Sequence, residues 1–176
     1  CACLVGSEMC IRDRVNNAGI SLHEGTIMDV HYEQFDKQIE TNLKGAYFLS
    51  QKFLRMYEKK HRNGGSILFL SSERGHYADD LPYGLIKAAI NSLTQGLAKM
   101  LIHSNIRINA IAPGITTTDM TGITKDDIYA DDYSTGRYYL PEEVAEVACF
   151  LVSDASSCLS GQIIICNNGD SINYRK

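Results

Sequence analysis

Three features are missing from this chain of 176 residues, and each absence removes a class of function. There is no basic excess: the formal net charge is -4, so a nucleic-acid partner is not expected. No run approaches the ~18 apolar residues that a membrane-spanning helix needs, so no membrane partner is expected either. The most apolar helical stretch, residues 144–152, is interrupted by Glu146. With 44% apolar and 22% charged residues, the composition is that of one ordinary globular domain.

A cysteine framework is also missing. Three of the six cysteines fall within the first ten residues, and the other three, Cys149, Cys158 and Cys166, show no Cys-x-x-Cys spacing. This pattern predicts neither disulfides nor a metal site, and it fits a reducing cytoplasm.

The first residues have neither helical nor strand periodicity, and residues 4–13 resemble one reading frame of a transposase adapter used in DNA library preparation. We therefore predict that residues 1–14 are a sequencing or assembly scar and that the domain covers residues 15–176. The alternative is that this head is a natural N-terminus.

Apolar periodicity predicts alternating helices and strands in the rest of the chain. In chain order these are helix 35–56, strand 66–70, helix 82–102, strand 106–112, a helix from Pro141, and strand 162–166. This order predicts an α/β fold, namely the C-terminal part of a doubly wound parallel sheet of the Rossmann type. The tyrosine-rich stretch 121–140 is interpreted as a lid or as a plain surface excursion.

Ser71 and Ser72 directly follow the strand at 66–70, and Tyr83 and Lys87 lie at the start of the next helix. Residues four apart lie on one face of a helix, so an ammonium beside the Tyr83 phenol would lower its pKa and make it an acid-base catalyst. Ligands bind at the carboxyl ends of strands in open α/β sheets, and Ser72 is therefore expected beside Tyr83. Alone, a Tyr-x-x-x-Lys spacing more often marks a solvated lysine beside a half-buried tyrosine.

The Tyr83–Lys87 pair does not stand alone, however: in its full set of motifs the chain resembles the short-chain dehydrogenase/reductase family. The matching residues are Asn16-Asn17-Ala18-Gly19, Asn42 in Thr41-Asn42-Leu43-Lys44-Gly45, Ser71-Ser72, Tyr83 with Lys87, and Pro113-Gly114 with Thr118. The chain is similar to 3-oxoacyl-acyl-carrier-protein reductases and, about equally, to polyol or sugar dehydrogenases. The spacing from Ser72 to Tyr83 is two residues shorter than is usual in the family, which leaves Ser71 as an alternative to Ser72.

The resemblance implies an oxidoreductase that uses NAD or NADP to transfer a hydride between nicotinamide and a carbonyl or alcohol carbon of a small-molecule substrate. It implies that the catalytic residues are Asn42 (orienting water in a proton relay), Ser72, Tyr83 and Lys87, without a metal. The residues expected at the cofactor are Asn16, Ala18, Gly19, Tyr83, Lys87, Pro113, Gly114, Ile115, Thr116 and Thr118. It also implies a homotetramer or homodimer, formed through the long helices, in the cytoplasm.

No Gly-x-x-x-Gly-x-Gly turn precedes a strand and helix in this sequence, so the residue that separates NAD from NADP cannot be read. We therefore expect the glycine-rich N-terminal half of the domain, roughly 80 to 100 residues, to be absent from this chain. Three alternatives stay open: an inactive fragment, a non-catalytic dinucleotide-binding relative and, less consistent with the Pro113-Gly114 segment, an extended sugar-nucleotide epimerase or dehydratase.

Overall fold

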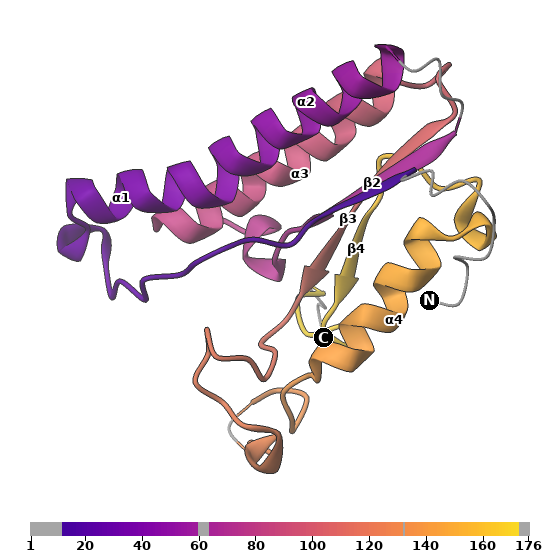
Figure 1. Ribbon diagram of the computed structural model, residues 1–176. Coiled ribbons are helices and arrows are strands. Elements are labelled where there is room, and N and C mark those ends of the chain that lie inside the picture. Colours follow the sequence, from indigo (N-terminus) through magenta and orange to yellow (C-terminus); the bar gives the residue numbers. More distant parts are fainter. Residues whose placement is uncertain (1–11, 60–63, 132, 173–176) are drawn as a thin grey trace.

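The computed structural model describes residues 12–59, 64–131 and 133–172. In these ranges the strands form one parallel sheet in the order β1-β2-β3-β4, with helices on both faces (Figure 1). The strands are β1 (Asp13–Asn16), β2 (Gly65–Leu70), β3 (Ile106–Pro113) and β4 (Ile163–Cys166). The α-helices are α1 (Tyr32–Gln38), α2 (Gly45–Lys59), α3 (Pro82–Met100) and α4 (Pro141–Val152). None of the helices in the described ranges is long and apolar enough to cross a membrane.

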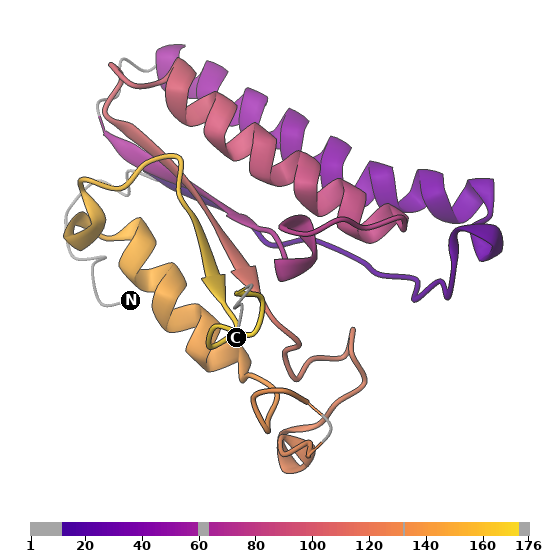
Figure 2. The same cartoon turned by 180° about the vertical axis from the view of Figure 1, so that it is seen from behind.

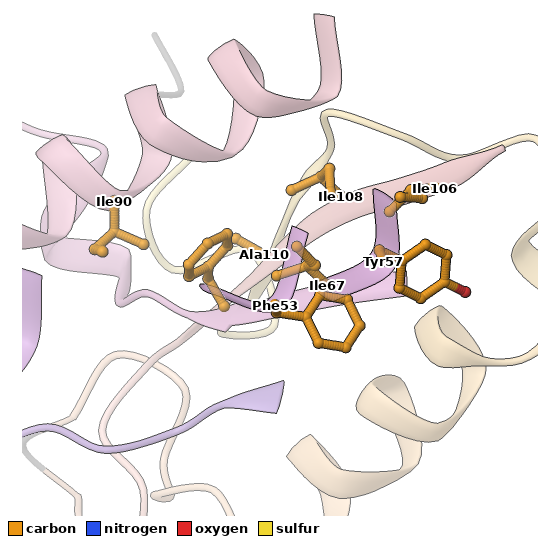
Figure 3. Packing of buried hydrophobic residues seen from close by; sticks show 8 residues of the cluster. Phe53, Tyr57, Ile67, Ile90, Ile106, Ile108 and Ala110 are labelled. Carbon is orange, nitrogen blue, oxygen red and sulfur yellow. The ribbon is translucent and has the colours of Figure 1, made fainter. Parts of the chain in front are cut away.

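The sheet separates two hydrophobic layers, as the predicted fold requires. The helices α2 and α3 lie side by side on one face, and α4 covers the other (Figures 1 and 2). Side chains alternate along a strand, so Ile67 and Phe69 of β2 pack under α2 and α3 while Leu68 packs with Leu151 of α4. Burial on both faces is the reason why residues 67–70 of β2 form a continuous apolar run in the sequence. Figure 3 shows the larger cluster, which comprises Phe53, Tyr57, Ile67, Phe69, Ile90, Ile106, Ile108 and Ala110.

Two polar residues of β3 face the α4 layer, and both are bonded there. Arg107 Nη1 donates to the carbonyl of Leu151 at 2.7 Å, and Nη2 donates to that of Ser153 at 3.0 Å. The last carbonyl groups of a helix have no partner within it, so this guanidinium satisfies them at the negative end of α4. Asn109 Oδ1 accepts from Gln162 N–H at 3.0 Å and fixes the turn that leads into β4.

The helix predicted over residues 35–56 is present but is not regular. Between α1 and α2, the segment Ile39–Lys44 is a π-helical turn, and the N–H of Gly45 donates to the carbonyl of Glu40. Such turns insert one residue into the helical repeat and are frequent at functional sites. Asn42 lies within this turn and is buried.

The first described strand starts earlier than the predicted domain boundary at residue 15. Asp13 and Arg14, which belong to the segment predicted as a scar, pair with Ser66 and Ile67 of β2. Residues 1–11 of that segment lie outside the described residues, so their origin stays a prediction.

Residues 121–140, predicted as a lid or a surface excursion, leave the sheet at the carboxyl ends of its strands and return to α4 (Figure 1). A β-bridge joins Tyr129 to Arg137 within this stretch, and the Ser134 hydroxyl donates to the Asp170 carboxylate after β4. The stretch therefore lies beside the edge of the sheet where the predicted functional segments begin.

Candidate active site

The parallel strands all end at one edge of the sheet, and the segments predicted to be functional start there. Asn16 ends β1, Ser71 follows β2, Gly114 follows β3 and Asn167 follows β4. In open α/β sheets this carboxyl edge is where ligands bind. The topology thus brings connections from distant parts of the sequence to one place.

Ser72, Tyr83 and Lys87 meet at the end of β2. Pro82 occupies the first turn of α3, which places Tyr83 and Lys87 on one side of the helix; the Lys87 ammonium lies 5.3 Å from the centre of the Tyr83 ring. The ammonium donates to the carbonyl of Leu70 at 2.7 Å. The Ser72 hydroxyl is within hydrogen-bonding reach of the Tyr83 phenol. The proximity predicted from the sequence is therefore present, although the loop between Ser72 and Tyr83 is short.

Ser71 and Ser72 have different surroundings. The Ser71 hydroxyl donates to Asn91 Oδ1 at 2.6 Å and lies 3.2 Å from the carbonyl oxygen of Lys87, so it fastens the end of β2 to α3. The Ser72 hydroxyl accepts from the N–H of Arg74 at 3.3 Å and caps the short helix η3 (Glu73–Gly75). Of the two serines, Ser72 is the one beside the Tyr83 phenol, and the geometry favours it as the functional residue.

The electrostatics of Tyr83 differ from the prediction. Burial raises the pKa of its phenol, and the opposing effects of the Ser72 hydrogen bond and the Arg74 charge are smaller. The predicted lowering of this pKa by Lys87 is wrong, because Lys87, whose own pKa is about 8, loses its charge before a phenol with a raised pKa ionises. Burial also lowers the pKa of Lys87 to about 8. Among the described residues Lys87 has no carboxylate partner, and its hydrogen bond is to a carbonyl. Burying an ammonium in this way is costly, and such groups concentrate at functional sites.

Asn42 and Gly19 lie beside Lys87. Asn42 Nδ2 donates to the carbonyl of Ile20 at 2.8 Å, and Asn42 Oδ1 accepts from the N–H of Ile20 at 2.8 Å. A β carbon at Gly19 would lie 3.6 Å from Asn42 Oδ1 and 3.8 Å from Lys87 Nζ. Asn42 therefore holds the turn after β1 against the lysine. Because both ends of its amide are bonded to Ile20, its role in orienting water stays a prediction.

The other residues predicted at the cofactor after β1 differ in exposure. Asn16 is buried, and its Nδ2 donates to the Ser50 hydroxyl at 3.1 Å, so this side chain joins β1 to α2. Ala18 is exposed in the turn that follows. Within this turn, then, the side chain of Asn16 has a packing role, and the surface open to a ligand is that of Ala18 and its neighbours.

The segment after β3 lies at the same edge but is held mainly by backbone contacts. A β carbon at Gly114 would lie 2.9 Å from the Tyr139 ring and 3.3 Å from the Glu73 carboxylate, so the position admits glycine alone. Ile115 and Thr118 are exposed. Within the described ranges, no hydrogen bond joins Tyr83 or Lys87 to the predicted cofactor residues Pro113, Gly114, Ile115, Thr116 and Thr118.

Comparison with known proteins identifies the family. Residues 13–171 match the family model described as enoyl-(acyl carrier protein) reductase. The chain belongs to the short-chain dehydrogenase/reductase family. The 3-oxoacyl-[acyl-carrier-protein] reductase of Thermotoga maritima is 39% identical over 160 residues, which are 88% of this chain and 64% of that relative. The NAD-dependent glycerol dehydrogenase of Listeria innocua is 37% identical over 163 residues, which are 89% of this chain and 63% of that relative.

Solved structures of short-chain dehydrogenases/reductases have the same fold. The 3-ketoacyl-(acyl-carrier-protein) reductase from Brucella melitensis, complexed with NADH, superimposes with a TM-score of 0.79 at 28% identity. The superposition covers 92% of this chain and 67% of that chain. The chain spans less than two thirds of the length of the curated short-chain dehydrogenases/reductases that it matches.

Sequence reasoning missed a set of charged residues in the loop that is shorter than usual for a short-chain dehydrogenase/reductase. The Glu73 carboxylate is buried, its pKa is raised by that burial, and it accepts from Asn167 Nδ2 at 2.8 Å. Arg74 forms an ion pair with Asp79 at 2.6 Å, and its guanidinium lies 5.7 Å from the centre of the Tyr83 ring. The available signal was the run of opposite charges between a strand and a helix, which in so short a loop must lie close together.

Proposed function

We propose that this chain carries the catalytic centre of an oxidoreductase that uses NAD or NADP to transfer a hydride between nicotinamide and a carbonyl or alcohol carbon of a small molecule. The observation on which the proposal depends is the Ser72 hydroxyl within reach of the Tyr83 phenol, beside the buried ammonium of Lys87. Membership of the short-chain dehydrogenase/reductase family supports it, as does the NADH bound to the Brucella melitensis relative.

The surroundings of Lys87 suit a dinucleotide. An ammonium has three N–H donors, and among the described residues Lys87 uses one of them, on the Leu70 carbonyl. The others are available to hydroxyl groups of a ribose. When bound, NADH or NADPH supplies the hydride. We assign Tyr83 and Lys87 to the ribose, and the segments after β1 and β3 to the rest of the cofactor, through Ala18, Gly19, Pro113, Gly114, Ile115, Thr116 and Thr118. The predicted cofactor residue Asn16 supports the first of these segments from below, through its hydrogen bond to Ser50.

In the reducing direction, Ser72 and Tyr83 donate hydrogen bonds to the substrate oxygen. Negative charge develops on that oxygen as its carbon accepts the hydride, and Tyr83 gives the oxygen its proton, so the product is an alcohol. Burial raises the pKa of Tyr83, which keeps the phenol protonated and ready to act as the acid. Lys87, with a pKa of about 8, is the nearby group that exchanges protons close to neutral pH and restores the Tyr83 proton. Asn42 holds the turn beside Lys87 and completes the proposed relay.

Tyr83→Phe in the whole protein tests this assignment, because the change keeps the ring and removes the proton. Turnover should fall by about 10²- to 10⁴-fold, while dinucleotide binding weakens by no more than about fivefold, the contribution of one hydrogen bond to the ribose. The control is Tyr32→Phe, the same change at a tyrosine of α1 that is 88% exposed, and it should keep the parent rate.

The assay follows oxidation of NADH and NADPH with a panel of ketones, aldehydes and acyl thioesters, and a fluorescence titration measures dinucleotide binding. Tyr83→Phe with the parent rate would contradict the assignment. Dinucleotide binding without turnover by the parent would instead favour the non-catalytic relative.

We also propose that the whole protein is a homodimer or homotetramer. The long helices expose several large apolar side chains: Tyr47, Phe48 and Leu49 on α2 are 46%, 54% and 49% exposed, and Leu85 on α3 is 50% exposed. Exposed apolar surface of this kind is typical of an interface. Sedimentation velocity of Phe48→Glu should show a smaller species, whereas Asp126→Lys, at an exposed residue outside both long helices, should sediment like the parent. An unchanged Phe48→Glu species would count against this surface.

A further inference from the structure

The loop before α3 holds an arginine in a fixed orientation. Arg74 Nε donates to Asp79 Oδ2 at 2.6 Å, and Nη2 donates to Asp79 Oδ1 at 2.8 Å. Two parallel bonds fix the plane of the guanidinium as well as its position. The Asp79 side chain is 8% exposed and that of Arg74 is 35% exposed, so the carboxylate is the buried partner. The arginine is therefore anchored from the protein side.

Asp79 is itself held by the start of α3. Its Oδ1 also accepts from the N–H of Leu81 at 2.9 Å, one residue before the helix. A β carbon at Gly84 would lie 2.0 Å from Asp79 Oδ2 and 2.6 Å from Asp79 Cβ. The glycine that directly follows Tyr83 thus provides the space that the carboxylate fills.

Arg74 contacts both members of the proposed catalytic pair. Its backbone N–H donates to the Ser72 hydroxyl at 3.3 Å, and its guanidinium lies 5.7 Å from the centre of the Tyr83 ring. A cation within about 6 Å of an aromatic centre is attracted to the ring. Lys87, on α3, is the second cation at this ring, at 5.3 Å. The short loop between Ser72 and Tyr83 is what brings Arg74 here.

We propose that Arg74, anchored by Asp79, is a positioning residue that orients the Tyr83 ring toward Ser72 and keeps a permanent positive charge beside the phenol. This role rests on the proposed function, in which Tyr83 gives up a proton. Among the described residues, the charged groups at the Tyr83 ring are Arg74 from the loop, which is paired with Asp79, and Lys87 from α3. Lys87, with a pKa of about 8, loses its charge in alkaline solution, whereas an arginine does not. Arg74 is then the cation that remains.

The test compares Arg74→Met and Arg74→Lys in the whole protein with a matched control. The control is Arg137→Met: Arg137 pairs with Glu143 at 2.6 Å and lies 5.5 Å from the centre of the Tyr139 ring, which is the same kind of contact at another tyrosine. If loss of an arginine from a carboxylate and an aromatic ring has only a structural effect, the Arg74 variants and Arg137→Met should behave alike. An effect on Tyr83 ionisation would appear with the Arg74 variants.

The first readout is the pH at which Tyr83 ionises, measured by NMR of isotope-labelled tyrosine rings. The Tyr83 signal is identified as the one that is missing from the spectrum of Tyr83→Phe. Arg74→Met should move the midpoint to higher pH by about half a unit or more, since a unit charge about 6 Å away contributes that much even under solvent screening. Arg74→Lys should recover part of the shift, and Arg137→Met should cause none. The second readout is the pH profile of kcat/KM, whose alkaline limb should move in the same direction in Arg74→Met.

A Tyr83 midpoint that is the same in Arg74→Met and the parent overturns the proposal. If Arg74→Met does not fold, Arg74→Gln replaces it, because glutamine keeps a hydrogen bond to Asp79 while losing the charge, and the absence of a shift there is equally decisive. Absence of turnover in the parent protein would overturn the proposed function. If the parent turns over substrate but the Tyr83 titration midpoint is the same with and without Arg74, only the positioning role is overturned.

Discussion

Replacing Lys87 by methionine should stabilise the fold at neutral pH. Lys87 is 5% exposed, and burial lowers its pKa from the usual 10.5 to about 8. At about 1.4 kcal/mol for each pH unit of difference, the buried ammonium costs about 3 kcal/mol of folding free energy. Methionine has a similar length and no charge, but it leaves the Leu70 carbonyl without its hydrogen bond, which costs about 1 kcal/mol. The net gain is about 2 kcal/mol.

This gain should disappear as the pH rises. Below about pH 8 the Lys87 side chain is charged in the folded and the unfolded protein, so the whole penalty applies. Between about pH 8 and 10.5 the folded protein has lost this proton while the unfolded chain retains it, and the parent gains stability relative to the variant. Above this range the lysine is neutral in both states, and Lys87→Met should be less stable than the parent by about 1 kcal/mol.

Urea unfolding at about pH 7 and about pH 10 measures the change. Subtracting the parent from the variant at each pH cancels the titration of the tyrosines and of the other lysines. The control is Lys99→Met, at an exposed lysine of the same helix. Its free energy of unfolding relative to the parent should change by less than about 0.5 kcal/mol between the two pH values. A difference between Lys87→Met and the parent that is constant across this range would refute the reasoning. The stabilised variant should have lost turnover, as expected where a costly residue serves function.

Two further pairs of variants test the site and its support. Ser72→Ala should lower kcat by about 10²- to 10³-fold. Ser71→Ala should instead lower the free energy of unfolding by about 1 to 3 kcal/mol, with a much smaller effect on kcat. Steady-state kinetics and urea unfolding measure the two quantities, and a larger loss of kcat in Ser71→Ala than in Ser72→Ala would contradict the assignment. Gly84→Ala should destabilise by about 2 kcal/mol or more, because the Asp79 side chain must move, whereas Gly96→Ala, where a β carbon meets no atom within 4 Å, should stabilise by about 0.5 to 1 kcal/mol. Equal thermal shifts for the two glycine variants would contradict this packing.

The order of elements was predictable because the sheet is buried on both faces. The strands at 66–70 and 106–112 were visible as short apolar runs, and the proline at the start of α3 and of α4 marked where each helix begins. The shared helix face of Tyr83 and Lys87 follows from their spacing of four. What was predictable therefore depends on local periodicity.

The electrostatics and the irregular turn could not be predicted, because they depend on contacts between distant residues. The spacing in the sequence places an ammonium near a phenol, but it does not reveal that Lys87 bonds to Leu70 at the end of a strand seventeen residues earlier. Asn42 lies in the π-helical turn and hydrogen-bonds to the backbone of Ile20, which is twenty-two residues away in the sequence. An amide beside an apolar stripe indicated an irregularity without showing its partner.

The three contacts of Asp79 have a consequence for protein engineering. One carboxylate joins Arg74 to the N-terminus of α3 and occupies the space above Gly84. A chimera that imports a longer loop from a relative would disrupt all three contacts at once, unless residues 73–84 were transplanted as one cassette. Insertions tolerated at the tip of an ordinary surface loop should be rejected here.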